Sequence, residues 1–162
     1  MTTTNRRHAM RLLATAASIA ALPALAASPA KTPMEVWKDP SCGCCKDWID
    51  VMEKAGFVVT VHDVGNSAVR AKLGLPQRLG GCHTALVGGY LVEGHVPAAD
   101  IRKLLKLKPR ALGIAAPGMP VGSPGMDGPE YKGQKDPYDV LLVTKNLMNS
   151  DVSTTVFTSY RG

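Results

Sequence analysis

Hydrophobic and polar positions follow two different periods along the central part of the chain. Residues 46–55 carry apolar side chains at helical spacing and are followed by Gly56, so an amphipathic helix is predicted there. Residues 67–73 form a shorter helical pattern that ends at Gly74, and residues 100–107 form a third one. Three helices are therefore expected, with strand-like segments between them.

Those strand-like segments have the period of two that a half-buried strand requires. A short apolar run at 34–37 precedes the first helix, and residues 58–64 alternate between apolar and polar side chains after it. Residues 84–87 and 90–92 flank a Gly-Gly pair, which is typical of a two-residue hairpin turn. The predicted order is β-α-β-α-β-β-α, a mixed α/β fold.

The last third of the chain has a different pattern. Residues 112–128 are rich in Gly and Pro and carry Met119 and Met126 in an approximate repeat, so they are predicted to form a loop and neither a regular helix nor a central strand. Residues 138–143 and 154–160 are rich in β-forming side chains and are predicted to pair as a C-terminal hairpin.

The N-terminus has the three parts of an export signal. Residues 1–11 are polar and basic, residues 12–26 are apolar and uncharged, and Ala24-Leu25-Ala26 fits a small-x-small cleavage site. The apolar run is shorter than the roughly 20 residues that span a bilayer. A signal peptide over residues 1–27 is predicted, with a buried N-terminal helix as the alternative.

The export route stays open, but both routes lead out of the bacterial cytoplasm. Arg6-Arg7 before the apolar run resembles a twin-arginine signal, whereas the remaining pattern also suits general secretion. We therefore expect a periplasmic protein with a linker at 28–33 and one domain at 34–161. No permanent membrane span is expected after cleavage of the signal.

Composition supports one domain and argues against a nucleic-acid partner. The 162 residues are 45% hydrophobic and 20% charged, which excludes global disorder and a protein with many membrane spans. The net charge is +6, but three of the 19 basic side chains lie in the predicted signal, and the remaining 16 are opposed by 13 acidic ones. No basic tract remains that would form a nucleic-acid groove.

The four cysteines carry the strongest chemical information. Cys42, Cys44 and Cys45 lie within four residues, and Cys82 follows later. Two structural disulfides are the ordinary interpretation in an exported domain. Adjacent cysteines would form a strained pair, however, and a Cys42–Cys45 bridge closes a short loop with little entropic benefit. A C-x-x-C before a helix N-terminus instead stabilises thiolates, so reactive or metal-binding thiols are favoured.

The order of elements around this C-x-x-C resembles the thioredoxin fold. In thioredoxins a cis-proline followed by Thr opens the first hairpin strand, and here His83 stands in the place of the proline, before Thr84. The resemblance implies that Cys82 lies beside the other three cysteines and that the loop containing His95 borders the same face. The missing proline counts against ordinary thioredoxin substrates and leaves the dithiol open to a metal.

Four motifs resemble a more specific family over residues 34–161. They are KDPSCGCC, GCHTALVGGYLVEGHVP, APGMPVGSPGM and DPYDVLLV. Together they resemble the CopG-like family of copper-resistance proteins, small exported metal-binding proteins formerly of unknown function. The resemblance implies a thioredoxin-like core, copper bound by the C-x-C-C cysteines and the later cysteine, and a role in copper redox chemistry.

The donor types agree with this implication. Thiolates and thioethers select Cu(I), and bridging thiolates favour a multinuclear cluster, whereas structural zinc usually takes two well-separated ligand pairs. His95 is a candidate ligand or proton donor, with an ordinary loop histidine as the alternative, and His83 ranks lower. The two methionines are either ligands or core residues. The candidate metal ligands are Cys42, Cys44, Cys45, Cys82, His95, Met119 and Met126.

Three functions follow from these features. The leading one is a periplasmic protein that binds Cu(I), contributes to copper resistance and cycles Cu(I) with Cu(II). The second is a thiol–disulfide oxidoreductase with Cys42 as the nucleophile and Cys45 as the resolving thiol. The third is a metallochaperone that passes copper ions to other exported copper-handling proteins.

Overall fold

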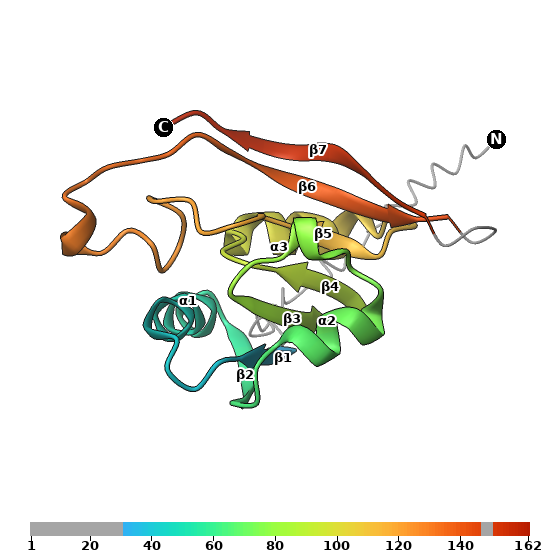
Figure 1. Cartoon of the computed structure of the whole chain (residues 1–162), viewed down its shortest axis with the longest axis horizontal. Helices are drawn as coiled ribbons and strands as arrows, with labels where there is room; N and C mark the ends of the chain where they lie inside the picture. Colours follow the sequence, from blue (N-terminus) through green and yellow to red (C-terminus); the bar gives the residue numbers. More distant parts are fainter. Residues whose placement is uncertain (1–30, 147–150) are drawn as a thin grey trace, which may run out of the picture.

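The computed structural model describes residues 31–146 and 151–162 (Figure 1). The predicted signal peptide, residues 1–27, lies outside the described residues. Within them, no helix is both long enough and apolar enough to cross a membrane.

The described residues form a mixed α/β fold around one sheet, which confirms the predicted class. The sheet has seven strands in the order β2-β1-β3-β4-β5-β6-β7. Strand β1 is parallel to β2, β4 is parallel to β5, and the other neighbours are antiparallel. The helices and strands are β1 (Thr32–Lys38), α1 (Gly43–Lys54), β2 (Phe57–His62), α2 (Ser67–Leu73), β3 (His83–Val87), β4 (Tyr90–Glu93), α3 (Ala98–Leu107), β5 (Gly113–Ala115), β6 (Tyr138–Lys145) and β7 (Val152–Tyr160), with short 3-10 turns at Gln77–Leu79 and Pro129–Tyr131.

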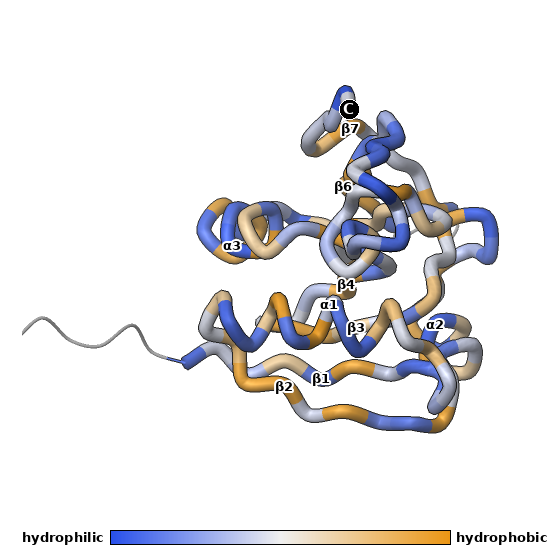
Figure 2. The backbone as a smooth tube through the Cα atoms, turned by 90° about the vertical axis from the view of Figure 1, so that its left-hand side faces the viewer, coloured by the Kyte–Doolittle hydropathy of each residue, from blue (hydrophilic) through white to orange (hydrophobic). Residues whose placement is uncertain are grey.

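Helix α1 forms because one of its faces is apolar, and Figure 2 shows its tube alternating between hydrophobic and hydrophilic colours. It buries Cys45, Trp48, Ile49 and Met52. The indole Nε1 of Trp48 donates a hydrogen bond to the Val96 carbonyl at 2.9 Å. The helix begins at Gly43, three residues before the predicted start, because the Cys42 sulfur caps it by accepting the Cys45 amide.

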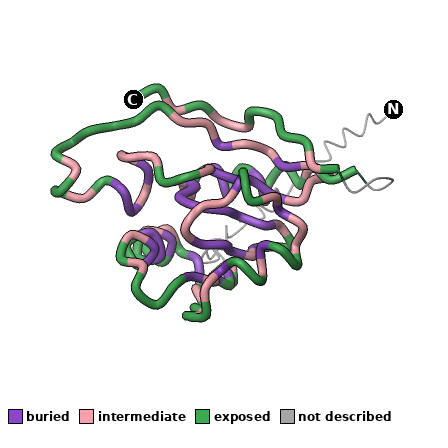
Figure 3. The backbone as a smooth tube through the Cα atoms, viewed as in Figure 1, coloured by how far each residue is buried: buried purple, intermediate pink, exposed green. Residues whose placement is uncertain are grey.

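The core lies on the central strands. Strands β3 and β4 are almost entirely buried, whereas the edge strand β7 is mostly exposed (Figure 3). The main cluster packs Val36, Ala85 and Val92 of the sheet against Trp48 and Ile101 of the helices.

The prediction that residues 112–128 contain no central strand is wrong. Strand β5, Gly113–Ala115, pairs with β4 on one side and with β6 on the other. The Pro-rich composition begins only at Pro117, so the first residues of the window are free to extend. Gly113 allows the close approach, since a Cβ there would clash with the backbone of Leu91.

The predicted C-terminal hairpin is present and is longer than its sequence pattern. Strands β6 and β7 pair from Tyr138 opposite Tyr160 to Lys145 opposite Val152, with a bulge at Val140/Leu141. They run side by side as a long ribbon along one edge of the molecule (Figure 1). Through β5, this hairpin extends the same sheet that carries the cysteine segments.

Candidate metal centre

Two segments far apart in the sequence supply the cysteines. Cys42 is the N-cap of α1, and Cys44 and Cys45 lie in its first turn. Cys82 comes directly before β3, and β3 pairs with β1 so that His83 is opposite Lys38. This register brings the residue before β3 to the end of β1 where the chain turns toward α1.

The four sulfur atoms lie together, as the thioredoxin resemblance implied. All four are within 4.8 Å of one another. The Cys44 sulfur is 3.6 Å from that of Cys42 and 3.8 Å from that of Cys82. Cys45 is fully buried, whereas the other three are half-buried, so the cluster is accessible from one side.

Cys42 and Cys45 form a disulfide, and Cys44 and Cys82 are free. The sequence favoured reactive thiols over structural bridges, and of the three predicted functions only the oxidoreductase pairs Cys42 with Cys45. Because thiolates are the ligands that metals bind, the disulfide holds back two of the four sulfurs until two electrons reduce it. The structure therefore represents the oxidised form of the cluster.

His95 lies against Cys82. Its Nε2 is 2.8 Å from the Cys82 sulfur, and its Nδ1 is 2.8 Å from the carbonyl oxygen of Pro124. A carbonyl only accepts hydrogen bonds, so Nδ1 carries the proton and Nε2 presents its lone pair to Cys82. The Cys82 thiol is then the donor to Nε2. Such an anchored imidazole is the arrangement found in histidine ligands of metals.

Burial keeps both members of this pair uncharged. Desolvation lowers the pKa of His95, while the Pro124 carbonyl and the charge of Asp127 act in the opposite direction. Desolvation, followed by the neighbouring Cys44, raises the pKa of the Cys82 thiol to about 12. At neutral pH Cys82 is therefore a thiol, and a metal ion that binds its sulfur must release a proton.

His83 lies closer to the cluster than its low ranking in the sequence suggested. It is fully buried, its Nδ1 is 3.5 Å from the Cys82 sulfur, and its ring packs on Trp48 with centroids 4.2 Å apart. Its Nε2 has no hydrogen-bond partner within the part of the chain that the structure describes. Neighbouring residues within a strand point to opposite faces. Cys82 lies just before β3, so this rule could not predict that the Cys82 and His83 side chains point to the same side.

The Gly/Pro-rich loop lies against both cysteine segments, and its two methionines differ in exposure. Met126 is 6% exposed, and its sulfur accepts a hydrogen bond from Tyr131 at 3.3 Å, whereas Met119 is 55% exposed. Gly118 forms an isolated bridge with Gly81. Met126 is thus a core residue in this structure, and Met119 presents a free thioether at the surface beside the Cys82 loop.

Gly125 brings the other end of this loop to α1. A Cβ at this position would lie 2.6 Å from the backbone nitrogen of Trp48 and 2.7 Å from the carbonyl oxygen of Cys44. The loop backbone therefore packs directly on the first turn of the helix. Its φ of +79° is a second reason for glycine here.

The donor set fits a soft or borderline metal ion. Cys42, Cys44, Cys45 and Cys82 form one group of converging ligand atoms, and Cys82, His83 and His95 form a second that shares a sulfur with the first. Thiolate and imidazole donors suit Cu(I) and Zn²⁺, while Mg²⁺ and Ca²⁺ require oxygen ligands. The site can therefore hold a thiophilic ion once the disulfide is reduced.

Comparison with known proteins places this site in a family. A family model described as a protein of unknown function, DUF411, matches residues 79–126, the stretch from the loop before Cys82 to Met126. A search of curated protein sequences found no match. Two solved structures named copper resistance protein CopG, form 1 and form 2, match with 44% identity and TM-scores of 0.71 and 0.70. They cover 82% and 80% of this chain, and the chain covers 99% and 98% of theirs. With this identity over almost the whole length of those relatives, the chain belongs to the family of the copper resistance protein CopG.

Proposed function

We propose that this protein binds Cu(I) in the periplasm and contributes to copper resistance. The observation that carries the proposal is the convergence of four cysteine sulfurs within 4.8 Å of one another, with the free lone pair of His95 against one of them. The relatives with 44% identity are themselves named copper resistance proteins.

The donor types favour Cu(I) over zinc. Three sulfurs come from one turn of α1 and its cap, where neighbouring thiolates are placed to bridge metal ions, whereas structural zinc usually takes two well-separated ligand pairs. Bridging thiolates support a cluster of several Cu(I) ions, and soft sulfur donors select Cu(I) from harder ions. Copper is the cargo of this site, and Cu(I)/Cu(II) cycling is part of the proposal.

Each residue has a role in this scheme. Reduction of the Cys42–Cys45 disulfide by an external dithiol, which supplies two electrons and two protons and itself becomes a disulfide, yields two thiols. These join Cys44 and Cys82 as thiolate ligands on deprotonation. His95 contributes Nε2 while Pro124 holds its other nitrogen. The exposed thioether of Met119 offers a first contact for Cu(I) at the surface, and Met126 supplies a second soft donor if the loop rearranges.

Export and a thioredoxin-like architecture belong to the same proposal. The predicted signal over residues 1–27 supports a periplasmic location, with the mature domain over 34–161. Parallel β1 and β2 around α1, and a β3–β4 hairpin antiparallel to β1, support a thioredoxin-like core. In that compartment the partners would be copper ions and other exported copper-handling proteins.

A Cu(I) titration tests the proposal. Protein expressed from the full-length chain is reduced without oxygen and titrated with Cu(I) against a competing chelator. Wild type should compete strongly, and a Cys42→Ser/Cys45→Ser variant should not. His95→Gln should weaken binding about 10-fold or more, whereas His62→Gln, which changes a histidine paired with Glu35 on β1, should leave it unchanged. Wild-type affinity no better than that of the double serine variant would refute the proposal.

A second function, thiol–disulfide oxidoreductase, is favoured by the disulfide itself. Its half-buried sulfur belongs to Cys42 at the N-cap of α1, and its fully buried sulfur belongs to Cys45, so an exposed nucleophile and a protected resolving thiol are both present. A Cys45→Ser variant should then trap a mixed disulfide through Cys42. Metal-free wild type that neither reduces nor oxidises a disulfide substrate would exclude this function.

A metallochaperone remains a variant of the copper proposal. The half-buried sulfurs of Cys44 and Cys82 would allow a copper ion to pass to an acceptor by ligand exchange. A transfer assay with exported copper-handling proteins as acceptors tests this role, and copper retention in the presence of every acceptor would exclude it.

A further inference from the structure

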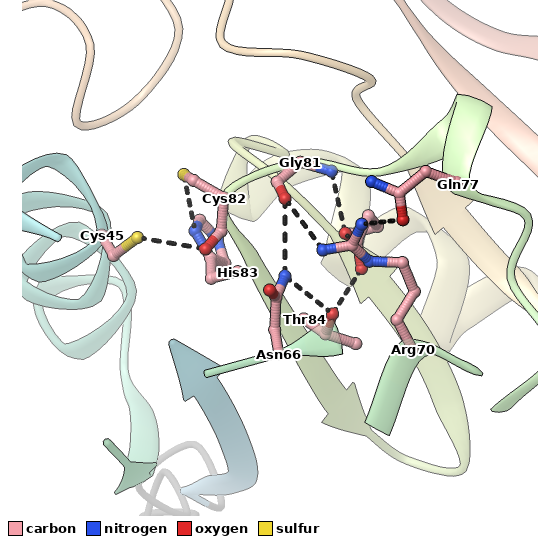
Figure 4. Close-up of polar contacts among 9 residues, drawn as sticks. Cys45, Asn66, Arg70, Gln77, Gly81, Cys82, His83 and Thr84 are labelled. Atoms are coloured by element: carbon pink, nitrogen blue, oxygen red, sulfur yellow. Dashed lines mark hydrogen bonds and ion pairs between the residues drawn. The ribbon is translucent and has the colours of Figure 1, made fainter. Parts of the chain in front are cut away.

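A group of buried polar side chains lies directly behind the loop that carries Cys82. Asn66 and Arg70 both donate to Gly81, the residue before Cys82, and Asn66 also donates to the Thr84 hydroxyl oxygen (Figure 4). Glu93, at the end of β4, completes the group and is fully buried. None of these four side chains is a candidate metal ligand.

The group holds the Gly81 backbone at both of its polar atoms. The amide of Gly81 donates to Glu93 Oε1 at 2.8 Å, and its carbonyl accepts from Arg70 Nη2 at 3.3 Å and from Asn66 Nδ2 at 3.4 Å. Glu93 Oε1 also lies 3.0 Å from Arg70 Nε, an ion pair without the alignment of a hydrogen bond. The other carboxylate oxygen accepts the Thr84 hydroxyl at 2.6 Å.

These contacts connect the two sides of the Cys82–His95 pair. Gly81 is one residue before Cys82, and Glu93 is two residues before His95, so the Glu93 side chain ties the two ligand-bearing segments together. Gly80 and Gly81 have no side chains with which to fix the loop by packing. The Gly81 backbone instead lies against that of Gly94, where a Cβ would meet the Gly94 Cα at 2.5 Å.

A buried ion pair is a poor source of stability, because desolvation of both charges offsets most of their attraction. Arg70 is 6% exposed and Glu93 is not exposed at all. The benefit of keeping such a pair lies in its fixed geometry, since each charged group offers several hydrogen bonds in defined directions. In this protein, hydrogen bonds of both Arg70 and Glu93 are directed at the Gly81 backbone.

We propose that Glu93 and Arg70 are positioning residues that hold Cys82 and His95 at the distance needed to bind one metal ion together. The inference rests on the proposed function, because it concerns the same site. Loss of the pair should detach the Cys82 and His95 donors, while the thiols of the α1 segment remain in place. The metal site would keep part of its sulfur ligands and lose affinity.

The test compares Glu93→Gln with a matched control, Asp100→Asn. Asp100 is also a buried carboxylate that accepts two hydroxyl groups, from Thr158 at 2.6 Å and Tyr160 at 2.7 Å, but its partners are on β7. Both substitutions remove one buried charge without changing side-chain size. Any effect common to both variants reports general stability, and an effect confined to Glu93→Gln reports the positioning of Cys82.

Two readouts are made on reduced protein from the full chain. Cu(I) competition should show affinity about 10- to 100-fold lower for Glu93→Gln, with fewer sulfur and nitrogen neighbours per copper in X-ray absorption spectra. The metal-free proteins are compared by hydrogen exchange of the Gly81 and Cys82 amides and by the alkylation rate of Cys82. Glu93→Gln should speed the exchange of both amides and the alkylation of Cys82. Asp100→Asn should match wild type in these rates and in Cu(I) binding.

A folded Glu93→Gln variant with wild-type affinity, copper neighbours and Gly81 exchange would overturn the inference, as would equal changes in Asp100→Asn. If wild type binds no Cu(I), the proposed function fails, and the metal-free exchange and alkylation data still decide whether Glu93 positions Cys82. If Glu93→Gln does not fold, Arg70→Lys is judged by the same criteria, because lysine keeps the charge but lacks the second nitrogen that reaches Gly81.

Discussion

Substitution of Gly125 by alanine should separate the metal site from the loop that covers it. Gly125 has a φ of +79°, and a Cβ there would press on the backbone of Cys44 and Trp48. The residue before it, Pro124, supplies the carbonyl that holds His95 Nδ1. A loop that moves away from α1 therefore removes the anchor of His95.

Gly133 provides the control for this experiment. It has a φ of +75°, and a Cβ there would meet no atom within 4 Å. Alanine at a left-handed position costs about 1 to 2 kcal/mol, and this loss should account for the whole effect of Gly133→Ala. Gly125→Ala carries the same backbone cost and loses the hydrogen bond to His95, worth about 1 kcal/mol, so its total should be about 2 to 3 kcal/mol.

Urea unfolding of both variants measures these losses, and Cu(I) competition measures the site. Gly125→Ala should bind Cu(I) about 10- to 100-fold more weakly, because His95 loses the partner that fixes its ring. Gly133→Ala should bind as wild type does. Equal stability losses in the two variants, together with unchanged Cu(I) affinity, would refute the claim that contact between Gly125 and α1 sets the position of His95.

Three further outcomes are expected. Because burial raises the pKa of Cys82 to about 12, its alkylation rate in metal-free protein should increase about tenfold per pH unit from about pH 8 to about pH 10, as measured by peptide mass spectrometry; a plateau near pH 9 would contradict this. Trp48→Phe keeps an aromatic ring on His83 but removes the hydrogen bond to Val96 and part of a fully buried side chain, so urea unfolding should show a loss of more than about 1 kcal/mol. Reduction of the Cys42–Cys45 disulfide should raise the Cu(I) capacity of the protein, and equal capacity before and after reduction would show that this pair supplies no ligand.

Sequence patterns were sufficient for the first seven elements because each has a complete local signal. The apolar face of α1, the Gly74 stop of α2 and the Gly-Gly turn between β3 and β4 are all determined by neighbouring residues. Strand β5 has no such signal, since three residues are too few to show a period. Its position in the sheet depends on partners at residues 91–93 and 141–143.

The site was predictable at its cysteines and less so around them. Clustering of the three cysteines at the start of a helix is visible in the sequence, whereas the side to which His83 points depends on where β3 begins. The buried Arg70–Glu93 pair had no sequence signal either, because an isolated Arg in a short helix and a Glu at a strand end usually face solvent. Whether Cys42 and Cys45 form a disulfide depends on the redox state of the protein as well as on its sequence, so the sequence alone left this point open.

Binding of a metal ion at this site would involve a fixed exchange of protons and electrons. In the structure described here, two sulfurs are oxidised in the Cys42–Cys45 disulfide, and Cys82 holds its proton against a neutral His95. Binding through all four sulfurs therefore requires two electrons for the disulfide and the release of protons from the thiols. A reducing and less acidic environment favours the metal-bound state, and oxidation or acid favours the metal-free one. Under the proposed function, uptake and release at this centre would thus be coupled to the redox state and to pH by the ligands themselves.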